Sequence, residues 1–299
     1  MTVDAQRSRS SGKRRAVFFQ FAGYPATVQR QVTPGVEQDR GVRVASDVHA
    51  VLPGVLDHGF MHHVLDDPSG LSPRAVRFLR HAAERTSLDV SHWPTTDELP
   101  LLSSRLPGVD VQATLTLFRR AAARYGGLRY RSVAWSFEET VTLVPVPWEA
   151  DDYGPEDREA MADLIAHDTA HPYAVWLRGD GAVVYCFTGP HSAPAVPVFP
   201  GVDAMLEAEA LYQECATWIP VSLDDVPGLA AVEAHAARLT SIPEASGYTE
   251  RWWEQDGFRL HIWKTFAAVF PGSGARWAVW ARSRSGELAA RTFLTQART

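Results

Sequence analysis

The fold is decided by one stretch of the chain, Tyr173-Ala-Val-Trp-Leu-Arg-Gly-Asp-Gly-Ala-Val-Val-Tyr-Cys-Phe187. Successive side chains of Tyr173 to Arg178 alternate between two sets, which is the period of a strand. Ala182 to Phe187 forms a second apolar run of strand length. Gly179-Asp180-Gly181 stands between them and tolerates the positive φ that a tight turn requires. The stretch therefore predicts a β-hairpin.

The residues on either side of this hairpin predict a sheet flanked by helices. Apolar alternation predicts two more strands, at Ser132 to Phe137 and at Thr140 to Val146. Helices are expected at Val111 to Tyr125, where Gly126-Gly127 then ends the helical pattern, and at Val202 to Cys215. The fold class predicted is α+β, with a mixed or antiparallel sheet flanked by helices.

The outer parts of the chain give weaker patterns. We expect helices at Arg74 to Thr86 and Leu229 to Leu239, and a short helix that ends at His167. Aromatic strands are expected at 258–266 and 276–282, and a Pro-rich linker at 93–108. The predicted organisation is a disordered tail (1–15), an N-terminal α/β region (16–110), a core (111–217) and a C-terminal α+β region packed on that core (218–299).

Composition narrows the class of protein. Of the 299 residues, 45% are apolar and 10 are Trp, which a disordered chain would not carry. The net charge of −6 argues against nucleic acid as the main partner. Cys186 and Cys215 are the two cysteines, too few for a disulfide framework. No apolar run approaches the ~18 residues of a membrane span, and no secretory apolar segment follows the basic N-terminus. We expect a cytoplasmic protein that does not bind membranes.

Motifs that carry catalytic or metal chemistry are missing or incomplete. The sequence contains no phosphate-binding Gly-rich loop, no Gly-x-Ser-x-Gly elbow and no cysteine pair with zinc spacing. Histidines cluster twice, as His58, His62 and His63 before Asp66 and Asp67, and as His167 and His171 around Asp168. Neither cluster offers a third ligand at usable spacing, and Pro172 favours a helix end before His171. We therefore expect solvated or capping histidines, no metal, no cofactor and no catalytic residues.

The strongest candidate for binding is an acidic loop. Six carboxylates lie within eleven residues, against the single base Arg158: Glu149, Asp151, Asp152, Glu156, Asp157 and Glu159. One interpretation is a solvated loop that contains a helix N-terminus, where acidic residues are favourable. The other is an anionic docking surface that attracts a cationic protein. The sequence leaves both open.

Four segments between residues 111 and 215 follow one another in a distinctive order: Phe118-Arg-Arg-Ala-Ala-Ala-Arg-Tyr-Gly-Gly-Leu128, Trp135-Ser-Phe137, Trp176-Leu-Arg-Gly-Asp-Gly-Ala-Val-Val-Tyr185 and Val202-Asp-Ala-Met-Leu-Glu-Ala-Glu-Ala-Leu211. This order of elements resembles the SUKH superfamily of bacterial immunity proteins and fungal cell-wall-synthesis regulators. The resemblance covers about a third of the chain. It implies a SUKH-like core with N- and C-terminal extensions. It also implies a protein that binds a toxin, often a nuclease, and lacks catalysis.

Two hypotheses follow. The first is an immunity or antitoxin-like protein that captures a partner protein, possibly a basic toxin. The alternative is an enzyme of a bacterial specialised pathway with a small-molecule pocket lined by six tryptophans: Trp135, Trp176, Trp252, Trp253, Trp263 and Trp280. A pocket of several hundred Å³ with convergent polar groups would favour the enzyme. An acidic face would favour the binding protein.

Overall fold

The structure is a computed structural model. It describes residues 62–90, 93–134, 139–155, 157–167, 173–187, 195–223, 227–269 and 274–298. All of the described residues belong to one compact unit, which spans His58–Thr299. Among the described residues, no helix has both the length and the apolar character needed to cross a membrane.

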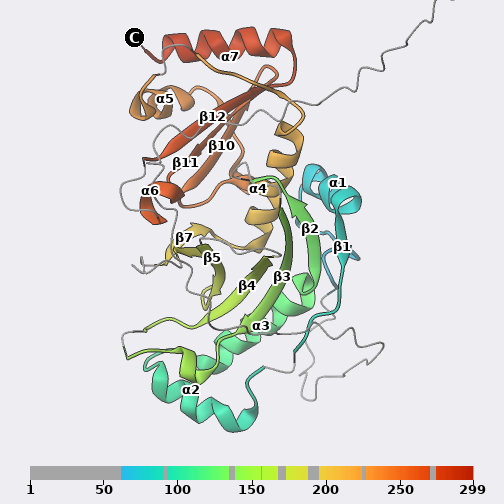
Figure 1. Ribbon diagram of the computed structural model, residues 1–299, viewed down its shortest axis with the longest axis vertical. Helices are drawn as coiled ribbons and strands as arrows, with labels where there is room; N and C mark the ends of the chain where they lie inside the picture. Colours follow the sequence, from blue (N-terminus) through green and yellow to red (C-terminus); the bar gives the residue numbers. More distant parts are fainter. Residues whose placement is uncertain are drawn as a thin grey trace, which may run out of the picture. The chain divides into compact units, whose positions relative to one another are not determined.

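A seven-stranded antiparallel sheet forms the larger layer of the unit (Figure 1). Its strands follow one another in chain order, from β1 to β7. They are β1 (Ala83–Arg85), β2 (Leu128–Ser132), β3 (Glu139–Pro147), β4 (Met161–His167), β5 (Tyr173–Arg178), β6 (Val183–Phe187) and β7 (Val196–Phe199). The predicted hairpin is β5 and β6, with Tyr173 opposite Phe187 and Leu177 opposite Val183. The α+β class and the antiparallel sheet are confirmed.

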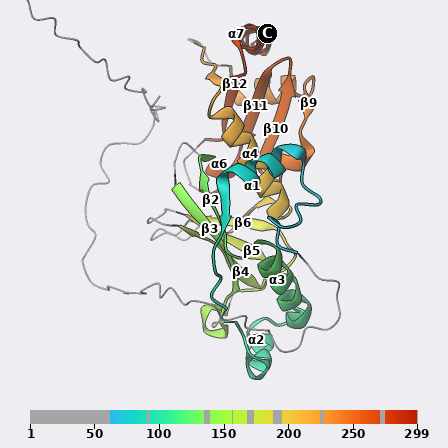
Figure 2. The ribbon, with the colours of Figure 1, turned by 90° about the vertical axis from the view of Figure 1, so that its right-hand side faces the viewer.

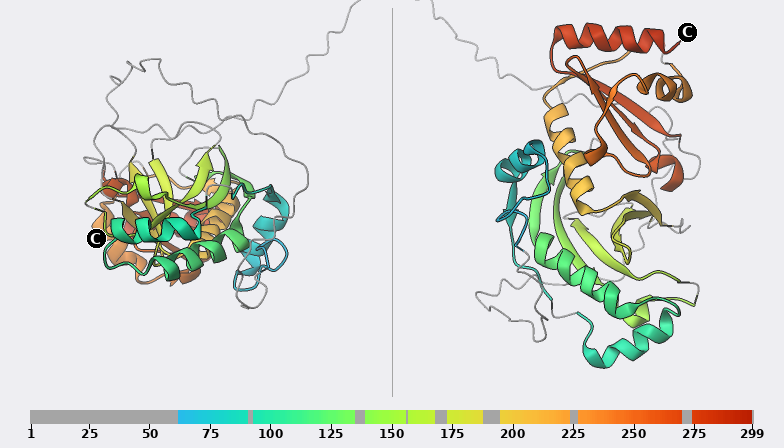
Figure 3. Two further views of the ribbon diagram at one scale, coloured as in Figure 1. Left: turned by 90° about the horizontal axis from the view of Figure 1, so that it is seen from below. Right: turned by 180° about the vertical axis from the view of Figure 1, so that it is seen from behind.

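Four helices accompany this sheet: α1 (Pro73–Ala82), α2 (Leu99–Arg105), α3 (Val111–Tyr125) and α4 (Val202–Cys215). α3 and α4 lie over one face of the sheet (Figure 3, right), and α1 packs against α4 (Figure 2). α4 is apolar around most of its circumference because it is covered from several directions. Gly127 adopts φ +78° after α3, and a side chain there would collide with the backbone oxygen of Thr86.

A second antiparallel sheet of five strands is built from the C-terminal part of the chain, in the order β8-β12-β11-β10-β9. The strands are β8 (Ile219–Pro220), β9 (Thr240–Ser241), β10 (Glu250–Gln255), β11 (Phe258–Trp263) and β12 (Arg276–Ala281). The helices are α5 (Leu229–Ala236), α6 (Thr265–Val269) and α7 (Arg284–Gln296). Asp256 and Gly257, at φ +40° and +81°, turn β10 into β11.

Strand alternation gives the second sheet two different faces. On one face Leu260, Ile262 and Val279 join a small apolar core with Phe293 and Leu294 of α7. The other face carries Trp252, His261 and Arg259, which contact side chains of α4. The polar and aromatic side chains of this sheet therefore meet the helix that covers the first sheet.

Several local predictions were wrong. The first helix ends at Ala82 rather than Thr86, and the chain continues as β1, which pairs with β2. The expected linker at 93–108 contains the one-turn helix η1 (Thr96–Glu98) and then α2. Met161–His167 is a strand between β3 and β5, not a short helix, because pairing within the sheet overrides local propensity.

Other boundaries shift less. β2 ends at Ser132, and residues 135–137 of the expected strand at 132–137 lie outside the described residues. β11 ends at Trp263, and 265–269 is helical where we expected a strand to continue. The expected domain boundaries at 110 and 217 lie within one compact unit, while the expected tail at 1–15 is not described.

Candidate functional site

The acidic loop lies between β3 and β4, around the one-turn helix η3 (Ala150–Asp152). Glu149, Asp151, Asp152 and Glu159 are exposed, Asp157 is half-buried, and Glu156 lies outside the described residues. Local hydrogen bonds shape the loop, since the backbone N–H of Glu149 donates to Asp152 Oδ2 at 2.9 Å and that of Gly154 donates to Asp157 Oδ2 at 2.6 Å. Asp152 and Asp157 therefore accept hydrogen bonds within turns, as the first interpretation predicts, and docking of a cationic protein stays a prediction.

Two ion pairs between this loop and cations are seen among the described residues. Asp151, whose side chain is 90% exposed, lies 3.8 Å from Arg105, which is a weak contact. Glu159 lies 3.5 Å from Arg178 and is thereby directed toward the β5–β6 hairpin. Arg158 donates to the backbone oxygens of Pro155 and Asp157 rather than to a carboxylate in any contact that the described residues show.

A small pocket extends the acidic loop onto the segment before α2. The pocket has a volume of about 180 Å³, and its lining residues are Trp93, Pro94, Thr95, Glu98, Leu102, Glu149 and Ala150. Its walls combine the side chains of Trp93, Pro94 and Leu102 with polar groups, among them the carboxylates of Glu98 and Glu149. Glu98 accepts hydrogen bonds from Thr95 N and Thr95 Oγ1 at 2.6 and 2.9 Å, which lower the pKa of its carboxyl group.

We call Glu98, Glu149, Asp151, Asp152 and Asp157 the acidic surface. Sequence reasoning missed Glu98, although Thr95-x-x-Glu98 carries the pattern of a capping box that begins a helix. It missed the pocket because nothing in the sequence indicates that the segment around Trp93 lies beside Glu149.

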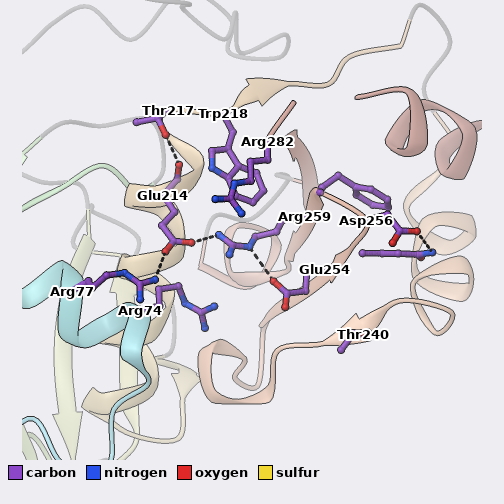
Figure 4. A pocket seen from close by; sticks show the side chains of 13 residues that line it. Arg74, Arg77, Glu214, Thr217, Trp218, Thr240, Glu254, Asp256, Arg259 and Arg282 are labelled. Carbon is purple, nitrogen blue, oxygen red and sulfur yellow. Dashed lines mark hydrogen bonds and ion pairs between the residues drawn. The ribbon is translucent and has the colours of Figure 1, made fainter. Parts of the chain in front are cut away.

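A second and larger feature is a charged cleft of about 860 Å³ (Figure 4). α1, α4, the β10–β11 hairpin and the segment after β12 contribute its walls. The lining residues are Arg74, Arg77, Glu214, Thr217, Trp218, Thr240, Glu254, Gln255, Asp256, Gly257, Phe258, Arg259 and Arg282. Figure 4 shows the guanidinium groups of Arg74, Arg259 and Arg282 directed into this shared space from different elements.

Arg259 is the fixed centre of the charged cleft. Its side chain is only 9% exposed; it donates from Nη1 to Glu214 Oε2 at 2.6 Å and from Nε to Glu254 Oε2 at 3.4 Å. Its guanidinium carbon lies 4.5 Å from the centre of the Trp218 ring. Burial is the largest single influence and opposes the charged form, but hydrogen bonds and charge attraction from Glu214 and Cys215 together outweigh it, and the pKa of Arg259 is raised.

A buried polar network lies between α4 and the second sheet. His261 Nε2 donates to Glu250 Oε2 at 2.5 Å, and Thr265 Oγ1 donates to Glu250 Oε1 at 2.5 Å. A carboxylate only accepts, so the proton of His261 is on Nε2, and Nδ1 accepts from the Tyr212 hydroxyl at 3.1 Å. The imidazole stacks on Trp252 and Trp263, with ring centres 4.1 and 4.7 Å away.

This network resembles an acid–base chain but has no access to solvent. His261 is 0% exposed and Glu250 is 2% exposed. Burial lowers the pKa of His261 although the Glu250 carboxylate acts in the opposite direction, so the imidazole is neutral. The arrangement therefore holds the second sheet against α4.

A further, half-buried acid lies on α4. Glu209 accepts from Ser132 Oγ at 2.9 Å, and burial raises the pKa of its carboxyl group to about 8. Glu209 and Tyr212 are one helical turn apart and therefore lie on the same side of α4. Glu214 lines the charged cleft, whereas neither Glu209 nor Tyr212 is among its lining residues.

The histidines do not form a metal site in the part of the chain that is described. His63 is 3% exposed rather than solvated, burial lowers its pKa, and His62 beside it is exposed. His167 lies in β4, while His58, Asp168 and His171 are outside the described residues. Among the residues described, no group of three or more His, Cys, Asp or Glu side chains is close enough to hold a metal.

The tryptophans proposed to line one pocket are dispersed. Trp252 is fully buried and stacks on Trp280, whereas Trp176 packs edge-on against Trp148. Trp253 packs against the small apolar core, and Trp135 lies outside the described residues. None of the five described tryptophans of this set lines the charged cleft, where Trp218 is the tryptophan among the described lining residues.

Comparison of the chain with protein-family models, with curated proteins and with solved structures finds no match.

Proposed function

We propose that this protein captures a basic partner protein through the acidic surface. The observation that carries the proposal is the geometry of Glu98 and Glu149, which line one pocket together with Trp93 and Leu102 and are followed along the chain by the exposed carboxylates of Asp151 and Asp152. Exposed carboxylates attract a cationic protein over a distance of about 8 Å at physiological salt. They therefore raise the association rate more than the affinity of the final complex.

The pocket offers a binding site for one anchoring side chain of the partner, which long-range attraction alone does not provide. Its volume of about 180 Å³ suits a single long side chain. Lys and Arg have aliphatic stems that bury against apolar walls such as Trp93 and Leu102, while their charged ends reach carboxylates at the rim. Arg beside an aromatic ring is a common anchor of protein interfaces.

The resemblance of residues 111–215 to the SUKH superfamily supports the same type of function, that of an immunity protein in the cytoplasm whose partner is a toxin. In this proposal the chain acts by binding and needs no cofactor. The partner is defined by its chemistry, a protein with an exposed Arg or Lys on a cationic face.

The proposal is tested by replacing Asp151, Asp152 and Asp157 with Asn in the full-length chain and measuring capture of the partner that co-purifies from the native host. A matched variant removes three charges elsewhere, with Asp66→Asn, Glu84→Gln and Glu233→Gln. We expect a basic partner, weaker capture by the first variant and unchanged capture by the second. An acidic partner, or equal capture by both variants, would refute the role of the acidic surface.

The alternative, an enzyme, is favoured by one observation. The charged cleft reaches about 860 Å³ and gathers polar side chains from several elements, as substrate pockets do. Its lining contains Thr217 and Thr240 but no Ser, Cys or His, so a hydroxyl nucleophile among the described lining residues would be a threonine. Loss of a measured turnover in a Thr217→Val variant would support this alternative.

A further inference from the structure

The charged cleft has no part in capture through the acidic surface, because the two share no lining residue. The cleft is also larger than the gaps that packing of side chains leaves, since well-packed interiors contain few voids larger than a water molecule. The hydrogen-bond donors and acceptors of its lining side chains indicate which class of ligand it could bind.

Hydrogen-bond donors outnumber acceptors in the charged cleft. Each guanidinium carries five N–H donors. Arg77 uses one of them in a contact with Glu214 Oε1 at 3.3 Å, and its side chain is 63% exposed. Arg74 donates to Glu244 at 3.1 Å, yet its buried Nε has no hydrogen-bond partner. Arg282 is exposed, and no ion pair of its side chain is seen among the described residues.

The carboxylates of the charged cleft are already bound. Glu214 lies between Arg77 and Arg259, and Glu254 accepts from Arg259. Asp256 Oδ2 accepts from Gln255 Nε2 at 3.2 Å. Two of the three acids thus hold Arg259 in place, and the donors of the other arginines remain available to a ligand.

Glu207, which approaches Arg74 from outside the charged cleft, is bound as well. Its carboxylate lies 3.6 Å from Arg74 and accepts from Ser72 N and Ser72 Oγ at 2.5 and 2.6 Å. It thereby caps the N-terminus of α1, and the positive end of the helix dipole offsets part of its charge.

We infer that the charged cleft binds a small ligand with more than one oxyanion group, phosphate or carboxylate, through Arg74, Arg77 and Arg282. The planar fork of a guanidinium matches two oxygens of such a group. Arg259, which is held by Glu214 and Glu254, forms part of the wall of the charged cleft. The volume of about 860 Å³ admits a ligand with several such groups.

The test is calorimetric titration of the full-length chain with sodium pyrophosphate and, separately, with sodium citrate, at ionic strength held constant with sodium chloride. The variant Arg77→Gln/Arg282→Gln removes two exposed cations and leaves the Arg259 ion pairs intact. Arg80→Gln is the matched control, because Arg80 is an exposed residue of α1 outside the cleft lining.

We expect binding of at least one anion, weakened about tenfold or more in the double variant and unchanged in Arg80→Gln. Binding of pyrophosphate alone would identify a phosphate ligand, and binding of citrate alone a carboxylate ligand. No heat of binding for either anion, or equal binding by the double variant and the wild type, would overturn the inference. Partner capture is measured separately, so the two proposals fail independently.

Discussion

In the charged cleft, Glu214 and Glu254 lie 2.6 to 3.4 Å from arginine nitrogens, whereas the ion pair that the described residues show for the acidic surface joins Asp151 to Arg105 at 3.8 Å. The two regions differ in burial at their centres, since the side chain of Arg259 is 9% exposed and that of Asp151 is 90% exposed. A buried charge needs partners because desolvation is expensive, while the field of exposed carboxylates reaches a distant molecule. Substitutions in the interior should therefore change stability, and those on the acidic surface should change association.

The largest effect is expected in the buried polar network. Glu250→Ala leaves His261 and Thr265 without their acceptor and should lower the free energy of unfolding by about 3 kcal/mol. Urea denaturation measures this loss, and Glu250→Gln, which keeps an acceptor oxygen, should lose less. Equal stability of Glu250→Ala and the wild type would show that the network does not hold the second sheet.

A pH-dependent effect is expected at Glu209. The folded chain keeps the proton of this carboxyl up to about pH 8, whereas the unfolded chain releases it near the ordinary pKa of 4.5. The folded pKa is raised, so the stability that this group contributes is complete below pH 4.5 and is lost as the pH rises to 8.

Glu209→Gln cannot ionise and should remove this dependence. The free energy of unfolding of the variant minus that of the wild type should increase by about 2 kcal/mol between pH 5 and pH 9. This value is reduced because the Glu209 side chain is partly exposed. Urea denaturation at several pH values measures the difference. A difference that is independent of pH would mean that Glu209 is ionised in the folded protein.

The hairpin of β5 and β6, α3, α4 and the α+β class could be predicted from the sequence, because they rest on local periodicity, and glycines mark the turn of the hairpin and the end of α3. β4 could not be predicted, since Met161–His167 becomes a strand through its neighbours β3 and β5. The acidic loop was visible as a run of residues, but Glu98 and Trp93 join it only through tertiary packing. The charged cleft combines α1 with β11, which are far apart in the sequence.

The anchoring pocket should affect the lifetime of the complex rather than its formation. Glu98→Gln removes a carboxylate beside Trp93 but keeps an oxygen for the bonds from Thr95. We expect the dissociation rate of the partner to rise about tenfold, with a small change in the association rate, measured by surface plasmon resonance. An unchanged dissociation rate would mean that no basic side chain of the partner occupies the pocket.

The smallest effect on stability is expected at the acidic surface. Asp151, Asp152 and Asp157 are exposed or half-buried, and Asn retains an oxygen for the turn contacts that Asp152 and Asp157 accept. The triple Asn variant should therefore unfold within about 1 kcal/mol of the wild type in urea. A larger loss would show that these carboxylates maintain the fold.

The association rate constant of the partner as a function of salt concentration tests the central claim most directly. For the wild type it should fall as salt rises, while the dissociation rate changes little. For the triple Asn variant it should be about fivefold lower at low salt and should depend less on salt. An association rate with the same value and the same salt dependence in both proteins would contradict capture through the acidic surface.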